Sequence, residues 1–283
     1  AFAVNPVNGS LRLLNMRQSF GSGPCHVSIG KKGDVLALAN YGSGSIALFE
    51  LNSDGSLGTE KSVIQHRGSS VNPGRQEGPH PHSANFNPED NRVIVPDLGL
   101  DALLVYEIDR GRLALKPEPE RFPSRPGAGP RHLAFHPDLR HAYVSNELDS
   151  TVTVLTYNRE DFSFKAVQVI SALPAGTEVF STSADIHIHP SGGFLYVSNR
   201  GHDSIAVFTV NRTDGSLTAA GHEPTRGRTP RNFLVSEDGR FLLAANQDTD
   251  TVATFAINDK TGGLSHVRTE EILSPVCLVT RCY

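Results

Sequence analysis

The 283-residue sequence predicts an all-β fold, a β-propeller made of four-stranded antiparallel blades. Five segments resemble one another and start near residues 23, 78, 129, 183 and 229, at intervals of 55, 51, 54 and 46 residues. Each holds short runs of β-branched and aromatic residues separated by turn residues, and no stretch shows a sustained helical period. Four strands in a repeat of about 45–55 residues are typical of a propeller blade.

The strands follow the same order in each repeat. In the fourth repeat, "ADIHIH" is the first strand, "PSGG" a turn, "FLYVSN" the second strand and "SIAVFTVN" the third. The turn "RTDGSL" then leads to a fourth, more exposed strand, because Asp-Gly pairs supply the positive φ of tight hairpins. "PDLR" and "SEDG" mark the first turn in the third and fifth repeats.

Both ends of the chain resemble parts of a blade. "AFAVNPVNGSLRLLNMRQ" is expected to form a third and a fourth strand, and "SPVCLVTRCY" a first strand. The two ends would complete one mixed blade and remove an exposed edge. The chain therefore holds about six blades' worth of strands, and we expect residues 1–283 to form a single β-propeller domain.

Composition excludes several partner classes. The chain has 26 basic and 30 acidic residues and a net charge of −4, so we expect no nucleic-acid partner. No apolar run approaches the roughly 20 residues of a membrane span, so we expect no membrane partner. The three cysteines, Cys25, Cys277 and Cys282, give no disulfide framework and favour a reducing, cytoplasmic location.

Polar residues converge at one end of the predicted inner hairpins. Because the first two strands of a blade are antiparallel, the start of strand one and the end of strand two open at the same face. The strand-one starts are Cys25, His26, His80, His82, Arg131, His132, Asp185, His187, Arg231 and Asn232. The strand-two ends are Asn40, Asp97, Asn146, Glu147, Asn199, Arg200, Asn246 and Gln247. These residues differ between repeats and carry both charges, which indicates a ligand site more than repeated packing.

The residue types indicate an anionic ligand. Arg131, Arg200 and Arg231 would repel one another unless an anion or acidic side chains lie among them. Arginine binds carboxylate or phosphate in a bidentate manner, histidine titrates near neutral pH, and glutamate can act as a general base. Alternatively, Glu147 and Asp185 only neutralise the arginines.

Other polar residues have structural explanations. The asparagines at strand ends are expected to cap turns, and His136 and His189 to be turn or packing residues. His26 and His187 are compatible with either role. We expect no metal and no cofactor, because carboxylates are few and the histidines lack zinc-motif spacing. The sequence also has no Gly-rich phosphate loop and no G-x-S-x-G motif.

Several motifs together resemble the lactonase family of seven-bladed β-propellers: "GPHPHSANFNPEDNRVIVPDLGLDALLVYEID", "GPRHLAFHP", "VSNELDSTVTVLTY", "ADIHIHPSGGFLYVSNRGHDSIAVFTV" and "TPRNF". This family includes propeller-type 6-phosphogluconolactonases and the carboxy-cis,cis-muconate lactonising enzymes. The resemblance covers almost the whole chain and implies seven blades, no metal and a cytosolic setting. The amino end looks shortened, because "AFAVNP" resembles the middle of the family's second blade.

The resemblance also implies site residues. The catalytic set of the family, a histidine, two arginines and a glutamate, matches His82, Arg131, Arg200 and Glu147. Asp185 and Arg231 match further positions typical of the family, and His80 is the second histidine of its motif. The substrate-binding set is therefore expected to be His80, His132, Asp185, Arg231 and Gln247.

We expect hydrolysis of an anionic sugar lactone, 6-phosphogluconolactone to 6-phosphogluconate, in the pentose phosphate pathway of carbohydrate metabolism. Arg131 and Arg200 would hold anionic oxygens and stabilise the oxyanion, while Glu147 or His82 activates water. The alternatives are a muconate-type cycloisomerase and a non-catalytic propeller that binds a metabolite or protein.

Hairpin geometry gives one specific expectation about the third repeat. Arg131 at the start of its first strand and Glu147 at the end of its second should face each other, with His136 and His141 at the far end. Arg131→Ala is then expected to abolish ligand binding with little loss of stability, and His136→Ala to do the reverse.

Overall fold

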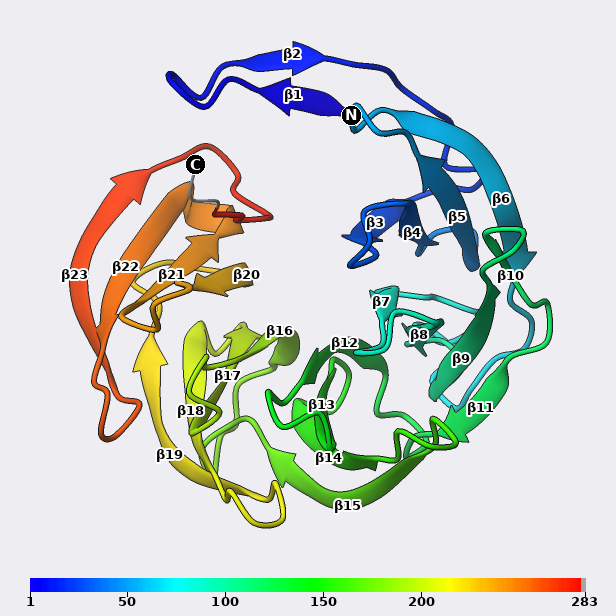
Figure 1. Ribbon diagram of the computed structural model, residues 1–283. Coiled ribbons are helices and arrows are strands. Elements are labelled where there is room, and N and C mark those ends of the chain that lie inside the picture. Colours follow the sequence, from blue (N-terminus) through cyan, green and yellow to red (C-terminus); the bar gives the residue numbers. More distant parts are fainter. Residues whose placement is uncertain (281–283) are drawn as a thin grey trace. The chain divides into compact units, whose positions relative to one another are not determined.

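A computed structural model describes residues 1–280 and divides them into two compact units, residues 1–130 and 131–280 (Figure 1). The strands of the described residues form six antiparallel sheets, and only a 3₁₀ turn at Gln247–Thr249 (η1) is helical among them. This arrangement confirms the predicted all-β class of four-stranded antiparallel sheets. The prediction of one domain over residues 1–283 remains a prediction.

The first unit contains three sheets. Strands β1 (Phe2–Val4) and β2 (Leu11–Leu13) form a two-stranded sheet. The second sheet has the order β3 (Pro24–Ile29), β4 (Val35–Asn40), β5 (Ser45–Leu51) and β6 (Leu57–Gln65). The third joins β7 (Asn85–Phe86), β8 (Arg92–Asp97) and β9 (Ala102–Asp109), and both β10 (Ala114–Leu115) and β11 (Glu120–Pro123) pair with β9.

The first strand of the third sheet is shorter than its repeat predicts. β7 has only two residues, and an isolated bridge joins Pro81 to Asp97 before it. His82 N donates to the Pro96 carbonyl at 3.0 Å, but Pro96 on β8 has no N–H group to return the bond to His82, so the ladder is interrupted before β7.

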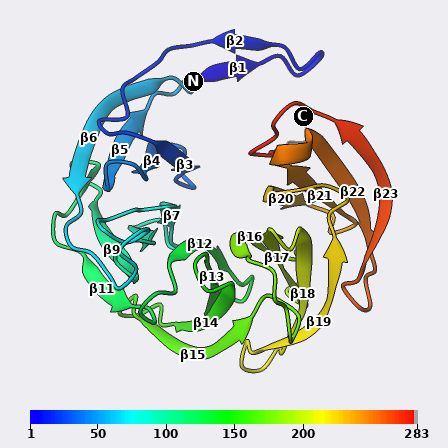
Figure 2. The ribbon, with the colours of Figure 1, turned by 180° about the vertical axis from the view of Figure 1, so that it is seen from behind.

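The second unit contains three regular four-stranded sheets. The first has the order β12 (Pro130–Phe135), β13 (His141–Asn146), β14 (Thr151–Tyr157) and β15 (Phe164–Ser171). The second sheet has the order β16 (Thr182–Ile188), β17 (Phe194–Arg200), β18 (Ser204–Val210) and β19 (Leu217–Pro224). The third has the order β20 (Pro230–Val235), β21 (Phe241–Asn246), β22 (Thr251–Ile257) and β23 (Leu264–Glu271). Within this unit β12, β16 and β20 lie along one edge and β15, β19 and β23 along the opposite edge (Figures 1 and 2).

The middle strands are apolar on both faces because a sheet packs against each face. In β17, Leu195 and Val197 join a core cluster with residues of β13 and β14, whereas Phe194 and Tyr196 join a cluster with residues of β20–β22. Successive side chains point to opposite faces of a strand, so "FLYV" fills two cores. In the first unit, residues of β4 and β5 pack in the same way against residues of β8 and β9.

Polar contacts join neighbouring sheets of the second unit at repeated positions. His136 lies against Gly192 of the next repeat, and a Cβ on Gly192 would come within 2.7 Å of the imidazole Nε2. His189 makes the same contact with Gly239, at 2.5 Å. Both imidazole Nε2 atoms are also hydrogen-bonded to the glycine carbonyls, at 3.0 and 2.9 Å. The interpretation of His136 and His189 as packing and turn residues is therefore confirmed.

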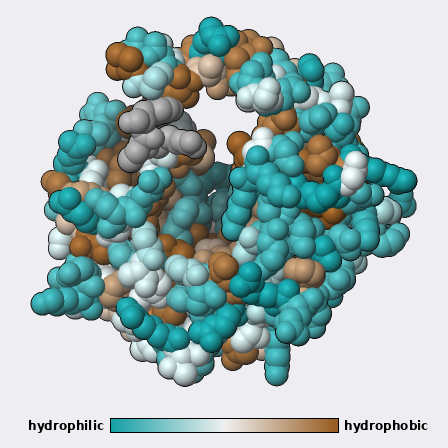
Figure 3. Space-filling view, viewed as in Figure 1, coloured by the Kyte–Doolittle hydropathy of each residue, from teal (hydrophilic) through white to brown (hydrophobic). Residues whose placement is uncertain are grey.

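The strands predicted at the amino end are present in the structure, whereas the strand predicted at the carboxyl end is absent from the described residues. The strand pair β1–β2 forms as predicted. Val7 in its turn and Leu11 in β2 are exposed. Figure 3 shows the mixture of hydrophilic and hydrophobic residues on one face of the molecule. The strand expected in "SPVCLVTRCY" is absent from its described part, Ser274–Thr280; Cys282 lies outside the described residues. Leu278 N donates instead to Asn232 Oδ1 at 2.7 Å, so a side chain holds this segment where a strand ladder was expected.

Asp138 closes the turn between β12 and β13. Its carboxylate accepts from the Arg140 amide at 2.8 Å, and His141 Nδ1 lies 2.9 Å from Oδ2. Leu139 adopts φ 58°, where the fourth and fifth repeats have Gly192 and Gly239. Partial burial would raise the pKa of Asp138, but the hydrogen bonds and the neighbouring His136 outweigh it and lower the pKa to about 2. This cluster offsets the cost of a non-glycine residue at a left-handed turn position.

We predict that Asp138→Asn lowers the free energy of unfolding at pH 7 by about 1–2 kcal/mol. Because the folded-state pKa is depressed, this stabilisation is present above the usual pKa and disappears as pH falls towards 2. Urea unfolding of both proteins at pH 7 and at pH 3 measures the difference. An equal difference at both values would show that Asp138 acts through packing and not through its charge.

Candidate active site

The β12–β13 hairpin brings Arg131 and Glu147 together. Arg131 is the second residue of β12, and Glu147 directly follows β13, to which β12 is hydrogen-bonded. Arg131 Nε donates to Glu147 Oε2 at 3.0 Å, and both side chains are almost fully buried. The predicted contact is confirmed, with His136 and His141 at the turn end of the same hairpin.

A second arginine shares the same carboxylate. Arg200, the last residue of β17, places Nη2 3.0 Å from Glu147 Oε2 and donates to the Ser183 carbonyl at 3.3 Å. Arg200 Nε is buried without a hydrogen-bond partner in residues 1–280. One carboxylate therefore separates two guanidinium groups that would otherwise repel each other.

Arg131 also connects Glu147 to the neighbouring sheet. Its Nη1 donates to the Ala184 carbonyl at 2.8 Å and lies 3.2 Å from His132 Nε2. Burial lowers the pKa of Arg131 to about 10; Glu147 opposes this effect, and the charges of Arg200 and Arg231 add to it. An arginine keeps its charge at neutral pH even so, and the surrounding groups must stabilise that charge.

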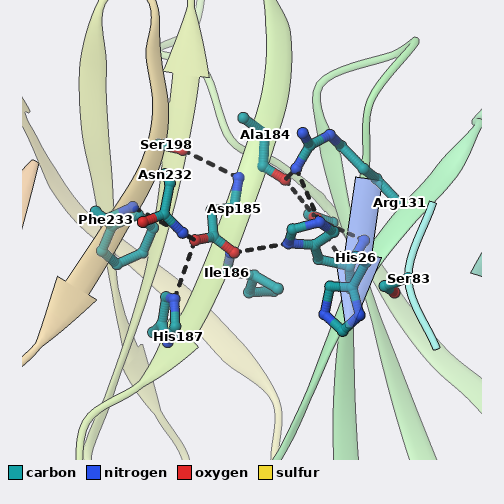
Figure 4. A network of polar contacts seen from close by, with 12 residues as sticks. His26, Ser83, Arg131, Ala184, Asp185, Ile186, His187, Ser198, Asn232 and Phe233 are labelled. Atoms are coloured by element: carbon teal, nitrogen blue, oxygen red, sulfur yellow. Dashed lines mark hydrogen bonds and ion pairs between the residues drawn. The ribbon is translucent and has the colours of Figure 1, made fainter. Parts of the chain in front are cut away.

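Asp185 forms a second buried acidic centre (Figure 4). It lies in a register shift of β16 between Ser183 and Ile186, which turns its carboxylate towards neighbouring strands. Its oxygens lie 2.7 Å from His132 Nδ1 and 3.1 Å from His187 Nε2, and they accept from Asn232 Nδ2 at 2.5 Å. Burial raises the pKa of Asp185, but His187 and His132 outweigh it and hold the pKa well below its usual value.

The remaining predicted site residues of the second unit make fewer polar contacts. Arg231 is half-buried at the start of β20 and makes no hydrogen bond or ion pair with any residue that the structure describes. Its charge nevertheless lowers the pKa of Arg131, so the two groups lie close together. Gln247 begins the 3₁₀ turn after β21, and its Oε1 atom is buried without a partner in the described chain.

His80 and His82 lie in the first unit, in the irregular segment before β7. His80 N donates to the buried Asp97 carboxylate at 2.8 Å, and its ring stacks on Tyr41 with centroids 4.4 Å apart. His82 is buried, with Nδ1 3.9 Å from Cys25 Sγ. Asp97 also binds His66 Nδ1 at 2.7 Å, so this carboxylate fixes the segment that carries both predicted histidines.

One group in the described part of the chain has side chains suited to a metal ion: His136, Asp138 and His141. These are the turn residues described above, and each has a hydrogen-bond partner within the turn or on the next repeat. The arrangement is explained by the turn itself.

Two residues of the Asp185 centre were not assigned from the sequence. His187 was compatible with two roles, and Asn232 was named among the converging strand-one starts without a role. The i, i+2 spacing of Asp185 and His187 on one strand was the available signal, because such residues point to the same face. The contact with Asn232 depends on how the next sheet packs and has no sequence signal.

Comparison with known proteins identifies the family. The family model described as "Lactonase, 7-bladed beta-propeller" matches residues 1–280. The chain belongs to this lactonase family. It is 42% identical to the 6-phosphogluconolactonase of Bacillus subtilis over 234 residues, which are 83% of this chain and 66% of that enzyme. The Formosa agariphila 6-phosphogluconolactonase is 35% identical over 239 residues, 83% of this chain and 67% of that enzyme.

A solved lactonase structure resembles this chain over most of its length. The periplasmic gluconolactonase of Pseudomonas aeruginosa superposes with a TM-score of 0.90 at 32% identity, covering 97% of this chain and 77% of that one. These matches confirm the β-propeller class. This lactonase-family chain spans about two thirds of the length of the first two relatives. None of the helices in residues 1–280 is long and apolar enough to span a membrane.

The burial of Arg131 changes the stability expected of its variants. Removing one partner of a buried ion pair costs about 3–5 kcal/mol, because the other charge remains buried. We therefore predict that Arg131→Ala lowers the free energy of unfolding by that amount, in contrast to the small loss expected from sequence. Arg231→Ala, which breaks no ion pair in the described chain, should cost less than about 1 kcal/mol. Urea unfolding of both variants tests the contrast, and equal losses would contradict it.

Proposed function

We propose that this chain hydrolyses an anionic sugar lactone, 6-phosphogluconolactone, to 6-phosphogluconate. The observation that carries the proposal is the charge balance of the second unit. Arg131, Arg200 and Arg231 lie near two buried carboxylates of the second unit, Glu147 and Asp185, so positive charge is in excess. An anion supplies the missing negative charge, and the relatives named 6-phosphogluconolactonase support a phosphorylated lactone.

In the proposed reaction, water attacks the lactone carbonyl and the ring C–O bond breaks, which gives a carboxylate and a hydroxyl group. Arg200 has an unpartnered Nε and a partly exposed side chain, so it is suited to stabilise the oxyanion. Arg131 is fully buried between Glu147 and Ala184, so its role is to hold Glu147 and the site in place. The roles of His80 and His82, and of Glu147 as the base, remain predictions. This assignment places the chain in the pentose phosphate pathway.

Arg231 is suited to the phosphate group, because its guanidinium has no partner in the described chain and lies near the other arginines. A small anionic lactone is therefore the proposed partner, with no nucleic acid and no membrane. We also propose a cytoplasmic location, which the low count of three cysteines supports. Cell fractionation tests the location.

The test of the activity is turnover of 6-phosphogluconolactone by the purified chain, with spontaneous hydrolysis subtracted. Glucono-δ-lactone and a carboxymuconate are offered in parallel. Turnover of the phosphorylated lactone supports the proposal, and turnover of the muconate alone would instead assign a cycloisomerase. A folded chain that acts on none of them would contradict an enzymatic role.

We predict that Arg231→Gln raises KM for 6-phosphogluconolactone about tenfold more than KM for glucono-δ-lactone, because a charge-assisted contact to phosphate is lost. Arg240→Gln, in an exposed turn of the same unit, is the matched control and should change neither value. Steady-state kinetics with both substrates measure the ratio. An unchanged ratio in Arg231→Gln would remove this residue from phosphate recognition.

A further inference from the structure

The Asp185 carboxylate distinguishes the two histidines that it contacts. Arginine has no acceptor atom, so Arg131 Nη1 donates to His132 Nε2, 3.2 Å away. His132 therefore carries its proton on Nδ1 and donates it to Asp185 Oδ1 at 2.7 Å. In this tautomer His132 is neutral, which agrees with a pKa lowered by burial and by the Arg131 charge.

His187 is in the opposite situation. Its Nε2 lies 3.1 Å from Asp185 Oδ2, and its surroundings favour the protonated ring. Desolvation would lower the pKa of His187, but the Asp185 carboxylate outweighs this effect and raises the pKa above its usual value. The Phe233 ring packs edge-on against the imidazole, with centroids 4.8 Å apart, and fixes its orientation.

Two features make His187 suitable for proton transfer. Its side chain is 37% exposed, whereas that of Asp185 is 5% exposed, so a substrate or water can reach the imidazole but hardly the carboxylate. Hydrogen bonds also connect it without interruption to Arg131, through Asp185 and His132, and Arg131 binds Glu147. His187 therefore belongs to the same network as the arginines.

We propose that His187 is a further catalytic residue, the proton donor for the leaving ring oxygen, and that Asp185 is its positioning residue. The proposal rests on the lactonase function proposed above. Water adds to the carbonyl carbon, the bond from that carbon to the ring oxygen breaks, and the ring oxygen takes a proton from His187. A base accepts the proton lost by water. His187 regains its proton from solvent, so lactone and water give the hydroxy acid.

The charged and titratable groups around His187 come from several elements. Asp185 lies on its own strand, and His132 lies on β12. Tyr196 is paired with His187 on β17, and its hydroxyl donates to the Gly262 carbonyl. Burial raises the pKa of the Cys277 thiol, and so does the charge of the nearby Asp185 carboxylate. Of these, Asp185 is the acidic group that favours the charged imidazole.

The test compares the pH dependence of kcat in the wild type, His187→Gln and Asp185→Asn. A proton donor must be protonated, so wild-type kcat should fall as pH rises through the raised pKa of His187. His187→Gln should lose at least about 100-fold in kcat and should lack this alkaline fall. Asp185→Asn should show the fall at lower pH, because the pKa of His187 is no longer raised.

If Asp185 had only a structural role, Asp185→Asn would not change the pH at which kcat falls. His266→Gln, on the exposed outer strand β23, is the matched control and should keep the wild-type profile. The imidazole Cε1–H signal of His187, identified by its absence in His187→Gln, gives the same pKa by NMR without an assay. If Asp185→Asn does not fold, the kcat and pH profile of His187→Gln decide whether His187 is the proton donor.

Wild-type activity separates the two ways in which the inference can fail. An active wild type with an unchanged rate and pH profile in His187→Gln would overturn the role of His187 and leave the lactonase function standing. A folded wild type that turns over no lactone would overturn the lactonase function and the proton-donor role together.

Discussion

Glu147 forms ion pairs with two arginines on two different sheets, and the charged groups of the second unit are arranged around it. Arg131 comes from the first sheet of that unit, Arg200 from the second, and both lie 3.0 Å from the same oxygen. A buried charge is costly without a partner, so this carboxylate allows two guanidinium groups to lie close together in a low-dielectric region. Both ion pairs with Glu147 form only when the two sheets pack in one relative position.

Contacts that recur between repeats hold the sheets of the second unit together, and residues that vary between repeats form its buried charge cluster. His136 and His189 make the same contact with the glycine of the following repeat, and Tyr143 and Tyr196 donate to the carbonyls of Gly215 and Gly262. These similar contacts fix neighbouring sheets. The strand-one starts differ instead: arginine, aspartate and arginine at positions 131, 185 and 231 face a common region. The repeated contacts and the variable charged residues therefore lie at different ends of the same hairpins.

Asp185 illustrates how a local irregularity in a strand places a carboxylate among several hydrogen-bond donors. The register shift in β16 frees the backbone around Asp185 from regular pairing, and its carboxylate then collects donors from three strands. Because His132 Nε2 accepts from Arg131, its Nδ1 carries the proton that is donated to Asp185. The fixed donor direction of arginine thus sets the tautomer of His132.

The sequence by itself determined the all-β class, the four-stranded repeats of the second unit and the facing pair Arg131 and Glu147, because strand period and hairpin geometry are local. It also separated His136 and His189 from the site. Only the tertiary structure decided that Arg131 is buried, that Arg200 shares Glu147, and that Asn232 reaches Asp185. It also showed that Ser274–Thr280 is held by a side chain and forms no strand. These features depend on contacts between sheets, which residue patterns within one repeat do not encode.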